Sequence, residues 1–457
     1  MAPRPNIIQI VVDDMGVGDL SRENGGASST PRLDALADEG VRLTQHYSGS
    51  PVCAPARAAL LTGRYPQRTG VIDTTEARGL DRLAVEETTL ADDLRATGYA
   101  TGLVGKWHNG AFDPAFHPTA RGFAEFVGFQ GGWRDYWEWT LDRGGSKMTA
   151  DGRHLTEVFT EEAVQFVRRH RDEPFYLHLA FNAPHYPLQA PEHLIERFSA
   201  PGRTRAVATI YAMLAMVDAG VERVLAELDV LGLADDTIVM FTSDNGPEAN
   251  GLGDASTHRF NLGMRGSKTH VFEGGVRVPL IIRWPAGLPR GGEHDALVHF
   301  IDWRPTLAAA AGATHVGTLP VDGTDAWSAL RGERPAAGAR FWQWTRYAPQ
   351  VESNCAMRDG DWKIVWPAWP GSLDVTPEDA RRDVEIKTNP PATIDTTPAP
   401  EVPRPTEVAP LLFDLAEDPL ESTDLSATHP ERVRVMTDAV HDWFDDVERS
   451  RRAASSL

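Results

Sequence analysis

The stretch Ile7-Ile8-Gln9-Ile10-Val11-Val12-Asp13-Asp14 decides the fold class of this chain. Its first six residues are mostly β-branched and apolar without alternation, which predicts a strand buried on both faces, as in a parallel sheet. Four later runs have the same character: residues 99–104, 175–180, 237–242 and 279–283. Helical patterns over residues 88–97, 156–170 and 205–231 separate them. We therefore predict an α/β fold with a large, mostly parallel sheet flanked by helices.

The character of the sequence changes after about residue 332. Short runs with polar alternation predict strands, and an amphipathic helix closes the chain. These segments are residues 340–345, 355–365, 411–415 and 431–449. We predict a catalytic domain over residues 1–332 and a smaller C-terminal α+β domain with a short antiparallel sheet over 333–457. Within the latter, residues 370–410 are rich in Pro and Thr and predict a long surface loop.

Composition limits the classes of partner. The chain has 457 residues with 45 basic and 65 acidic side chains, a formal net charge of −20, which argues against nucleic acid or an anionic membrane as partners. No apolar run has transmembrane length and no signal-peptide pattern is present, so we expect a cytoplasmic protein. Two cysteines, Cys53 and Cys355, are too few for a disulfide framework.

Polar residues follow four of the predicted strands. They are Asp13-Asp14, Lys106-Trp107-His108, Ala183-Pro184-His185 and Asp244-Asn245-Gly246. Each is ordinary turn chemistry when taken alone. Because ligands of open α/β sheets bind beyond the carboxyl ends of the strands, their joint placement predicts one functional rim.

Oxygen ligands dominate this rim. Asp13, Asp14, Asp244 and Asn245 suit a hard divalent cation, and several protein ligands favour Ca²⁺ over Mg²⁺, which retains its waters. Zinc would need histidine or thiolate ligands at a spacing that the sequence does not show.

The run Cys53-Ala54-Pro55-Ala56-Arg57 lies just ahead of a predicted helix that ends at Gly63. Free N–H groups at such a helix terminus favour an anion. An incidental cysteine before a helix explains the run equally well when it is taken alone. Lys268 can reach the same rim, and together with Arg57 and Lys106 it would give an acidic chain a local positive field.

Several motifs together resemble a known family. Cys53-x-Pro55-x-Arg57 with Leu61-Thr62-Gly63-Arg64 resembles the first signature of type I sulfatases, and Gly105-Lys106-Trp107-His108 resembles their second. The two acidic pairs and Lys268 match in type and order, and the resemblance runs from residue 6 to about residue 310. It implies an alkaline phosphatase-like fold and conversion of Cys53 to Cα-formylglycine by a separate formylglycine-generating enzyme. It also places position 53 among the metal ligands.

The resemblance implies a role for each motif residue. Hydrated formylglycine attacks the sulfur of a small sulfated substrate, with Asp244 as the activating carboxylate in the family pattern. Lys106 and Lys268 stabilise the sulfuryl oxygens together with the metal. His185 or Lys268 protonates the leaving oxygen, and His108 deprotonates the second hydroxyl. Arg57 holds the diol and the nearby carboxylates.

Three other functions stay open at this stage. A plain Cys53 thiol is a competing nucleophile. A phosphonate monoester or phosphodiester hydrolase of the same superfamily shares the Cys-x-Pro-x-Arg motif. A catalytically silent protein that binds sulfated ligands is a third reading, although the complete motif set argues against it.

The alcohol part of the substrate, a carbohydrate or an aryl or alkyl group, is not fixed by these motifs. The aromatic run of residues 131–139 predicts either a stacking wall or a packed loop. A group of C-terminal tryptophans would either close the pocket or form the core of the C-terminal domain, the latter being favoured for Trp362. The others are Trp342, Trp344, Trp366 and Trp369.

Overall fold

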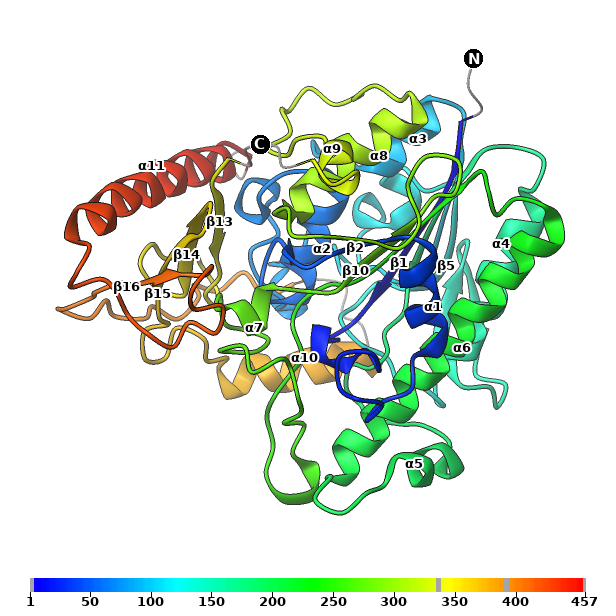
Figure 1. The fold of residues 1–457 in the computed structure, drawn as a ribbon, viewed down its shortest axis with the longest axis horizontal. Coiled ribbons are helices and arrows are strands. Elements are labelled where there is room, and N and C mark those ends of the chain that lie inside the picture. Colours follow the sequence, from blue (N-terminus) through cyan, green and yellow to red (C-terminus); the bar gives the residue numbers. More distant parts are fainter. Residues whose placement is uncertain (1–3, 334–337, 389–393, 455–457) are drawn as a thin grey trace.

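A computed structural model describes residues 4–333, 338–388 and 394–454 of the chain. Its centre is a ten-stranded sheet with the order β11-β2-β10-β9-β1-β8-β4-β5-β6-β7 (Figure 1). β1 (Asn6–Val12) lies between β8 (Phe175–Ala180) and β9 (Thr237–Ser243) and is parallel to both. β4 (Ala100–Lys106) continues the parallel set beside β8. The four carboxyl ends therefore meet at one edge.

The apolar sequence of β1 follows from its burial on both faces. Ile8, Ile10 and Val12 pack in one hydrophobic cluster with α1 (Pro31–Glu39), α4 (Leu155–Arg169) and α6 (Arg205–Leu231). Ile7 and Val11 pack on the opposite face with α2, α3 and α8. The bounds of these last helices are Cys53–Thr62, Leu90–Ala96 and Trp303–Ala311. Because helices cover both faces, the strands need no polar alternation.

The edges of the sheet depart from the parallel pattern. β10 (Leu280–Arg283) runs antiparallel to β9, and β5, β6 and β7 extend the far edge, with antiparallel pairing of β5 with β6 and of β6 with β7. The sheet is nevertheless mostly parallel at its centre, so the predicted fold class is confirmed. The other strands of this region are β2 (Val41–Leu43), β3 (His46–Tyr47), β5 (Glu125–Phe129), β6 (Thr140–Arg143), β7 (Ser146–Thr149), β11 (Gly292–His294) and β12 (Val298–His299). The other helices are α5 (Glu192–Phe198), α7 (Glu273–Val276), α9 (Trp327–Leu330) and short 3-10 turns, among them η3 (Glu76–Arg78).

A second sheet follows in the C-terminal part. Four antiparallel strands are arranged in sequence order, and α11 (Pro430–Ala454) packs along them (Figure 1). The strands are β13 (Arg340–Gln343), β14 (Cys355–Asp359), β15 (Trp362–Trp366) and β16 (Leu411–Asp414). The predicted run 355–365 is thus a hairpin that turns at Gly360, whose φ of 58° suits glycine. Its inner face joins the hydrophobic cluster under α2, so one apolar core connects both sheets.

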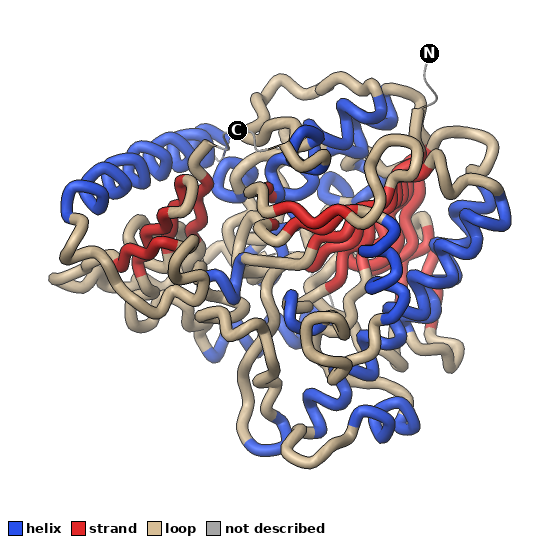
Figure 2. The backbone as a smooth tube through the Cα atoms, viewed as in Figure 1, coloured by secondary structure: helices blue, strands red, loops and turns tan. Residues whose placement is uncertain are grey.

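The segment 370–410 is not only a surface loop. It contains α10 (Pro377–Thr388), which packs against η3, while its flanking described residues are loop (Figure 2). The helix is held by polar contacts rather than by a broad apolar face. The Arg78 Nε donates to Asp379 at 2.9 Å, and the Ala77 N–H donates to Asp383 at 3.0 Å. This docking explains why a pattern search for core residues missed the helix. No helix in the described part of the chain is long and apolar enough to cross a membrane.

Candidate active site

The carboxyl ends of the central strands bring the predicted site residues together. Asp13 and Asp14 directly follow β1, Asp244 and Asn245 follow β9, and Lys106 is the last residue of β4. The first residue of α2, Cys53, faces them, with its Sγ 3.4 Å from Asp13 Oδ1. The structure therefore brings four distant segments together at one sulfur atom.

Local backbone geometry explains how neighbouring residues face the same site. Consecutive side chains of an extended strand point to opposite faces. Asp14 nevertheless faces the same site as Asp13, because its φ of 66° turns the chain sharply after β1. The Asp14 N–H donates to Asp244 Oδ1 at 3.2 Å. His108 also adopts a positive φ, of 51°. A Cβ at Gly105 would lie 1.9 Å from the carbonyl oxygen of Ala180, so only glycine fits immediately before Lys106.

Helix α2 begins at Cys53 itself, which corrects the expectation that this residue lies just ahead of the helix. Val52 is the N-cap in an extended conformation, and Pro55 falls within the first turn, where its missing N–H costs nothing. Gly63 ends the helix with a φ of 69°, as the sequence indicated. Every residue of the helix is buried, so position 53 is rigidly held.

Each acidic side chain at the rim is paired with a cation. The Lys106 Nζ donates to Asp13 Oδ2 at 2.5 Å, and the Lys268 Nζ donates to Asp14 Oδ2 at 2.7 Å. Arg57 contacts Asp244 Oδ2 at 2.7 Å. Burial alone would raise the pKa of Asp13, but the surrounding cations, Lys106 foremost, lower it well below its ordinary value. Asp13 is therefore a carboxylate.

Burial and charge also set the other ionisation states. Burial, with Lys106 and Arg57, lowers the pKa of His108 well below its ordinary value. Burial, with Lys268, also lowers the pKa of His185. Burial alone would lower the pKa of Lys268, but Asp14 raises it far above its ordinary value. Burial and Asp13 raise the pKa of the Cys53 thiol, which disfavours the thiolate that a plain cysteine nucleophile needs.

The donor set fits a hard divalent cation. Ligand atoms of Asp13, Asp14, Cys53 and Asp244 all lie within 4.8 Å of one another. Asn245 donates its amide to Asp14 Oδ1 at 2.7 Å, while its own Oδ1 is buried and has no hydrogen-bond partner among the described residues. Burial and the neighbouring Asp13 raise the pKa of Asp244. A cation would relieve this repulsion and use the unpaired amide oxygen.

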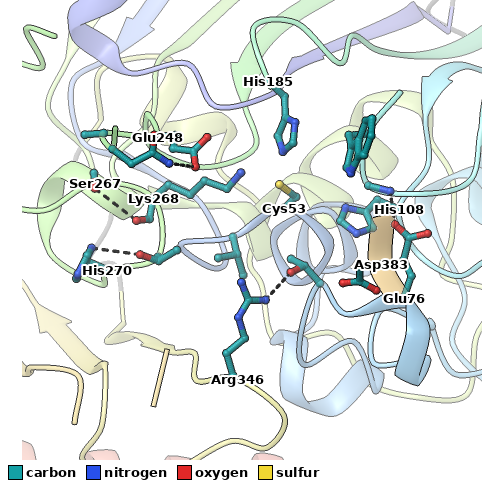
Figure 3. A pocket seen from close by; sticks show the side chains of 17 residues that line it. Cys53, Glu76, His108, His185, Glu248, Ser267, Lys268, His270, Arg346 and Asp383 are labelled. Carbon is teal, nitrogen blue, oxygen red and sulfur yellow. Dashed lines mark hydrogen bonds between the residues drawn. The ribbon is translucent and has the colours of Figure 1, made fainter. Parts of the chain in front are cut away.

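A cavity of about 470 Å³ opens above Cys53 (Figure 3). His108, His185 and Lys268 line it and point toward the sulfur from different sides. The other predicted residues lie behind Cys53 and do not line the cavity; these are Asp13, Asp14, Arg57, Lys106, Asp244 and Asn245. The site thus has an accessible layer and a buried charged layer.

Sequence reasoning missed residues that line the outer part of the cavity. Glu76, His270, Arg346 and Asp383 belong to η3, to loops and to α10. They carry no local motif, and Arg346 and Asp383 reach the cavity only through the docking of the C-terminal region. The one sequence signal was that polar residues occur in segments without a regular helix or strand pattern.

The aromatic residues of segment 131–139 serve both predicted roles, since one lines the cavity and others pack in the core. Trp133 lines the cavity, whereas Tyr136 and Trp139 are buried in the core beside α4. None of the C-terminal tryptophans lines this cavity, and most are packed in the core of that region; Trp342, Trp344, Trp366 and Trp369 are buried and Trp362 is partly buried. Both cysteines are free, so no disulfide removes Cys53 from the site.

Known proteins are similar to this chain in sequence and fold. Residues 5–313 match the family model described as Sulfatase. The chain belongs to the sulfatase family. Steryl-sulfatase from Mus musculus is 32% identical over 99% of this sulfatase and 83% of the mouse protein, and arylsulfatase A from Bos taurus is 32% identical over 93% and 84%. The crystal structure of Ps i-CgsB in complex with k-i-k-neocarrahexaose superposes with a TM-score of 0.80 and 28% identity, covering 96% of this chain and 93% of that one.

These findings establish the superfamily and the reaction class. The fold is that of the alkaline phosphatase-like superfamily, and the sulfatase is a sulfuric ester hydrolase. Members of this family generally use a formylglycine and a divalent metal.

Proposed function

We propose that this sulfatase cleaves a sulfate monoester through a formylglycine at position 53 and a calcium ion. One observation carries the proposal: the Cys53 side chain lines a cavity, and its sulfur lies within 4.8 Å of an oxygen of each of three carboxylates. Asp13, Asp14, Asp244, Asn245 and position 53 would hold the ion. In the hydrolysis, the bond between sulfur and the alcohol oxygen breaks, and water supplies the new oxygen on sulfur and the proton on the alcohol.

Hydrated formylglycine would supply the nucleophilic oxygen at the place where cysteine has sulfur, and the cation would supply positive charge beside that oxygen. The chain's own residues orient this position. Arg57 contacts Asp244 at 2.7 Å and Asp13 at 3.8 Å and is 1% exposed, so it fixes the carboxylates around residue 53. Lys106 holds Asp13 from the other side. This buried layer keeps the site preorganised.

His185 is the better candidate for the proton donor to the leaving oxygen. Its Nδ1 donates to the carbonyl of Tyr186 at 2.6 Å, so Nε2 is the nitrogen left for the cavity, and it carries the transferable proton when the ring is protonated. Burial lowers the pKa of His185, which makes its protonated form a stronger acid. Lys268 retains its proton because Asp14 raises its pKa, so it stabilises charge on the sulfuryl oxygens instead. His108 is neutral and can accept a proton at the opposite wall.

Mass spectrometry of the peptide that contains Cys53 tests the modification. Protein made in a host with a formylglycine-generating enzyme should carry the aldehyde at this position and release sulfate from 4-nitrophenyl sulfate. Cys53→Ala should abolish sulfate release and keep the urea-unfolding midpoint of the parent. An active protein with an unmodified thiol, or an active Cys53→Ala variant, would contradict the proposal.

The same preparation separates the rival reaction. Rates of 4-nitrophenyl sulfate and of a phenyl phosphonate monoester are measured side by side, with Cys53→Ala as the blank. The proposal expects a higher kcat/KM for the sulfate. A phosphonate preference of several orders of magnitude would assign the chain to the alternative hydrolase class.

A further inference from the structure

Two residues from the C-terminal part of the chain contribute to the outer wall of the active-site cavity. Arg346, from the loop after β13, and Asp383, from α10, both line the cavity on the side away from His185 (Figure 3). Neither belongs to a sulfatase motif and neither touches the carboxylates around Cys53 in any hydrogen bond of the described residues. Their place suggests contact with the part of the substrate beyond the sulfate.

Arg346 is fixed in place yet keeps part of its guanidinium for a ligand. One terminal nitrogen, Nη1, donates to Asp73 Oδ1 and to Thr74 Oγ1, each at 2.8 Å. The guanidinium also stacks over the ring of Trp344, 4.9 Å from its centroid. Its other terminal nitrogen, Nη2, makes no hydrogen bond within the described residues. Because the Nη1 hydrogen bonds and the stacking on Trp344 hold the group, this nitrogen is a preorganised donor at the cavity wall.

Asp383 is held in a similar way. Its Oδ1 accepts the Ala77 N–H at 3.0 Å, and its Oδ2 accepts no hydrogen bond from the described residues. The helix that carries it is attached to η3 by the ion pair of Arg78 with Asp379, whose N···O distance is 2.9 Å. The free oxygen is therefore a positioned acceptor in the same cavity that Arg346 lines as a donor.

The cavity offers polar and apolar surface to a ligand in equal measure. Among its described lining residues, the apolar side chains are Val52, Trp133 and Ala249. Trp133 meets Tyr186 edge to face at 6.3 Å between ring centroids, which steadies one aromatic face beside the polar wall. An aromatic face combined with a carboxylate and a guanidinium suits a ring that has an apolar face and hydroxyls at its edge. A steroid or simple aryl group would leave the two charged groups without hydrogen bonds.

We propose that Asp383 and Arg346 form a hydroxyl-binding subsite for a sugar ring whose sulfate ester lies at position 53. A ring hydroxyl donates to Asp383 Oδ2, and the same or a neighbouring hydroxyl accepts from Arg346 Nη2. This assignment rests on the proposed sulfatase reaction and names its substrate class as carbohydrate sulfates. The two residues determine specificity and take no part in the transfer of the sulfuryl group.

The test compares kcat/KM for three kinds of probe: glucose, galactose and N-acetylglucosamine 6-sulfates, 4-nitrophenyl sulfate, and a steroid sulfate. Wild-type enzyme should prefer one of the sugar sulfates. Burial raises the pKa of Asp383 to about 7, so the assay is run at pH 8, where the side chain is charged. Asp383→Asn should then lower the ratio of sugar to aryl kcat/KM by about tenfold or more, mainly through KM, because a charged hydrogen bond is lost. Glu378→Gln, on the exposed side of the same helix, is the matched control and should keep the wild-type ratio.

Asp379→Asn separates recognition from docking of the helix, since Asp379 holds α10 but does not line the cavity. It should lower stability more than it changes the substrate ratio. A wild-type preference for the aryl or steroid sulfate, or an equal loss on sugar and aryl probes in Asp383→Asn, would overturn the subsite. Failure of modified wild-type enzyme to release sulfate from every probe would instead overturn the proposed function.

Discussion

Replacing Lys363 by methionine removes the centre of a buried charge cluster that joins the two sheets. The Lys363 Nζ lies 2.9 Å from Glu273 Oε1 and 2.9 Å from Glu421 Oε1, and its side chain is fully buried. Glu273 also accepts the hydroxyl of Tyr47 at 2.7 Å, and its N–H donates to Glu421 at 2.7 Å. The variant would leave two buried carboxylates adjacent to each other without their shared cation.

The size of the effect follows from the ionisation of Glu273. Burial alone would raise its pKa, yet Lys363, followed by Arg358 and Arg277, lowers it from 4.5 to about 2. That difference corresponds to about 3 kcal/mol, and removing one partner of a buried pair costs about 3–5 kcal/mol. Because the folded-state pKa is depressed, this stability is present above pH 4.5 and is lost as the pH falls toward 2. We therefore expect Lys363→Met to lose about 3–4 kcal/mol at pH 7.

Equilibrium urea unfolding, followed by tryptophan fluorescence at pH 7.5 and pH 5, measures this loss. The deficit should be smaller at pH 5, because without Lys363 the buried carboxylates gain protons more readily and protonation relieves their repulsion. Lys147→Met, at an exposed lysine of β7, is the matched control and should change stability by less than about 0.5 kcal/mol. A deficit below about 1 kcal/mol at pH 7.5, or one that does not depend on pH, would refute the reasoning.

Three further changes test the site and its frame. Exhaustive chelation should lower the thermal midpoint and stop sulfate release, because carboxylates with ligand atoms within 4.8 Å of one another then repel. Added Ca²⁺ should restore the midpoint and the activity better than Mg²⁺ does. Unchanged stability after verified metal removal would contradict this expectation. His185→Ala should lower kcat by about 10²–10⁴-fold on an alkyl sulfate and less on 4-nitrophenyl sulfate, whose leaving group needs no proton; equal losses would argue against the acid role. Asp218→Ala should lower the free energy of unfolding in urea by about 1–2 kcal/mol. The reason is that Asp218 accepts hydrogen bonds from the N–H groups of Leu33 and Arg32 at the start of α1, at 2.8 and 3.1 Å. A loss under about 0.3 kcal/mol would show that this cap is dispensable.

The centre of the fold and the rim of the site could be read from local sequence. Uninterrupted apolar runs such as that of β1 have few structural alternatives when helical segments lie between them. Parallel strands then force their carboxyl ends together, so Asp13, Lys106 and Asp244 had to meet near one another. The topology of the sheet alone predicts that these residues are close together, without knowledge of side-chain packing.

The outer wall of the cavity could not be read in this way. Asp383 lies on a polar helix whose position depends on ion pairs with residues three hundred positions earlier, such as Arg78 with Asp379. Arg346 reaches the cavity only because the second sheet packs against α2 through a shared core. Such contacts leave no periodic pattern in the sequence. Because the residues that flank α10 are rich in Pro and Thr, the whole segment was predicted to be a loop.

Charge counting at the rim changes one expectation from the sequence. Arg57, Lys106 and Lys268 were expected to give a local positive field, but the structure pairs them with Asp244, Asp13 and Asp14. Three cations against three carboxylates give no net charge, and the two histidines add none because burial lowers the pKa of each. In a chain of net charge −20, a neutral site does not attract a sulfate ester. A divalent cation among the carboxylates would make the rim positive, so we infer that the metal serves substrate capture as well as the reaction itself.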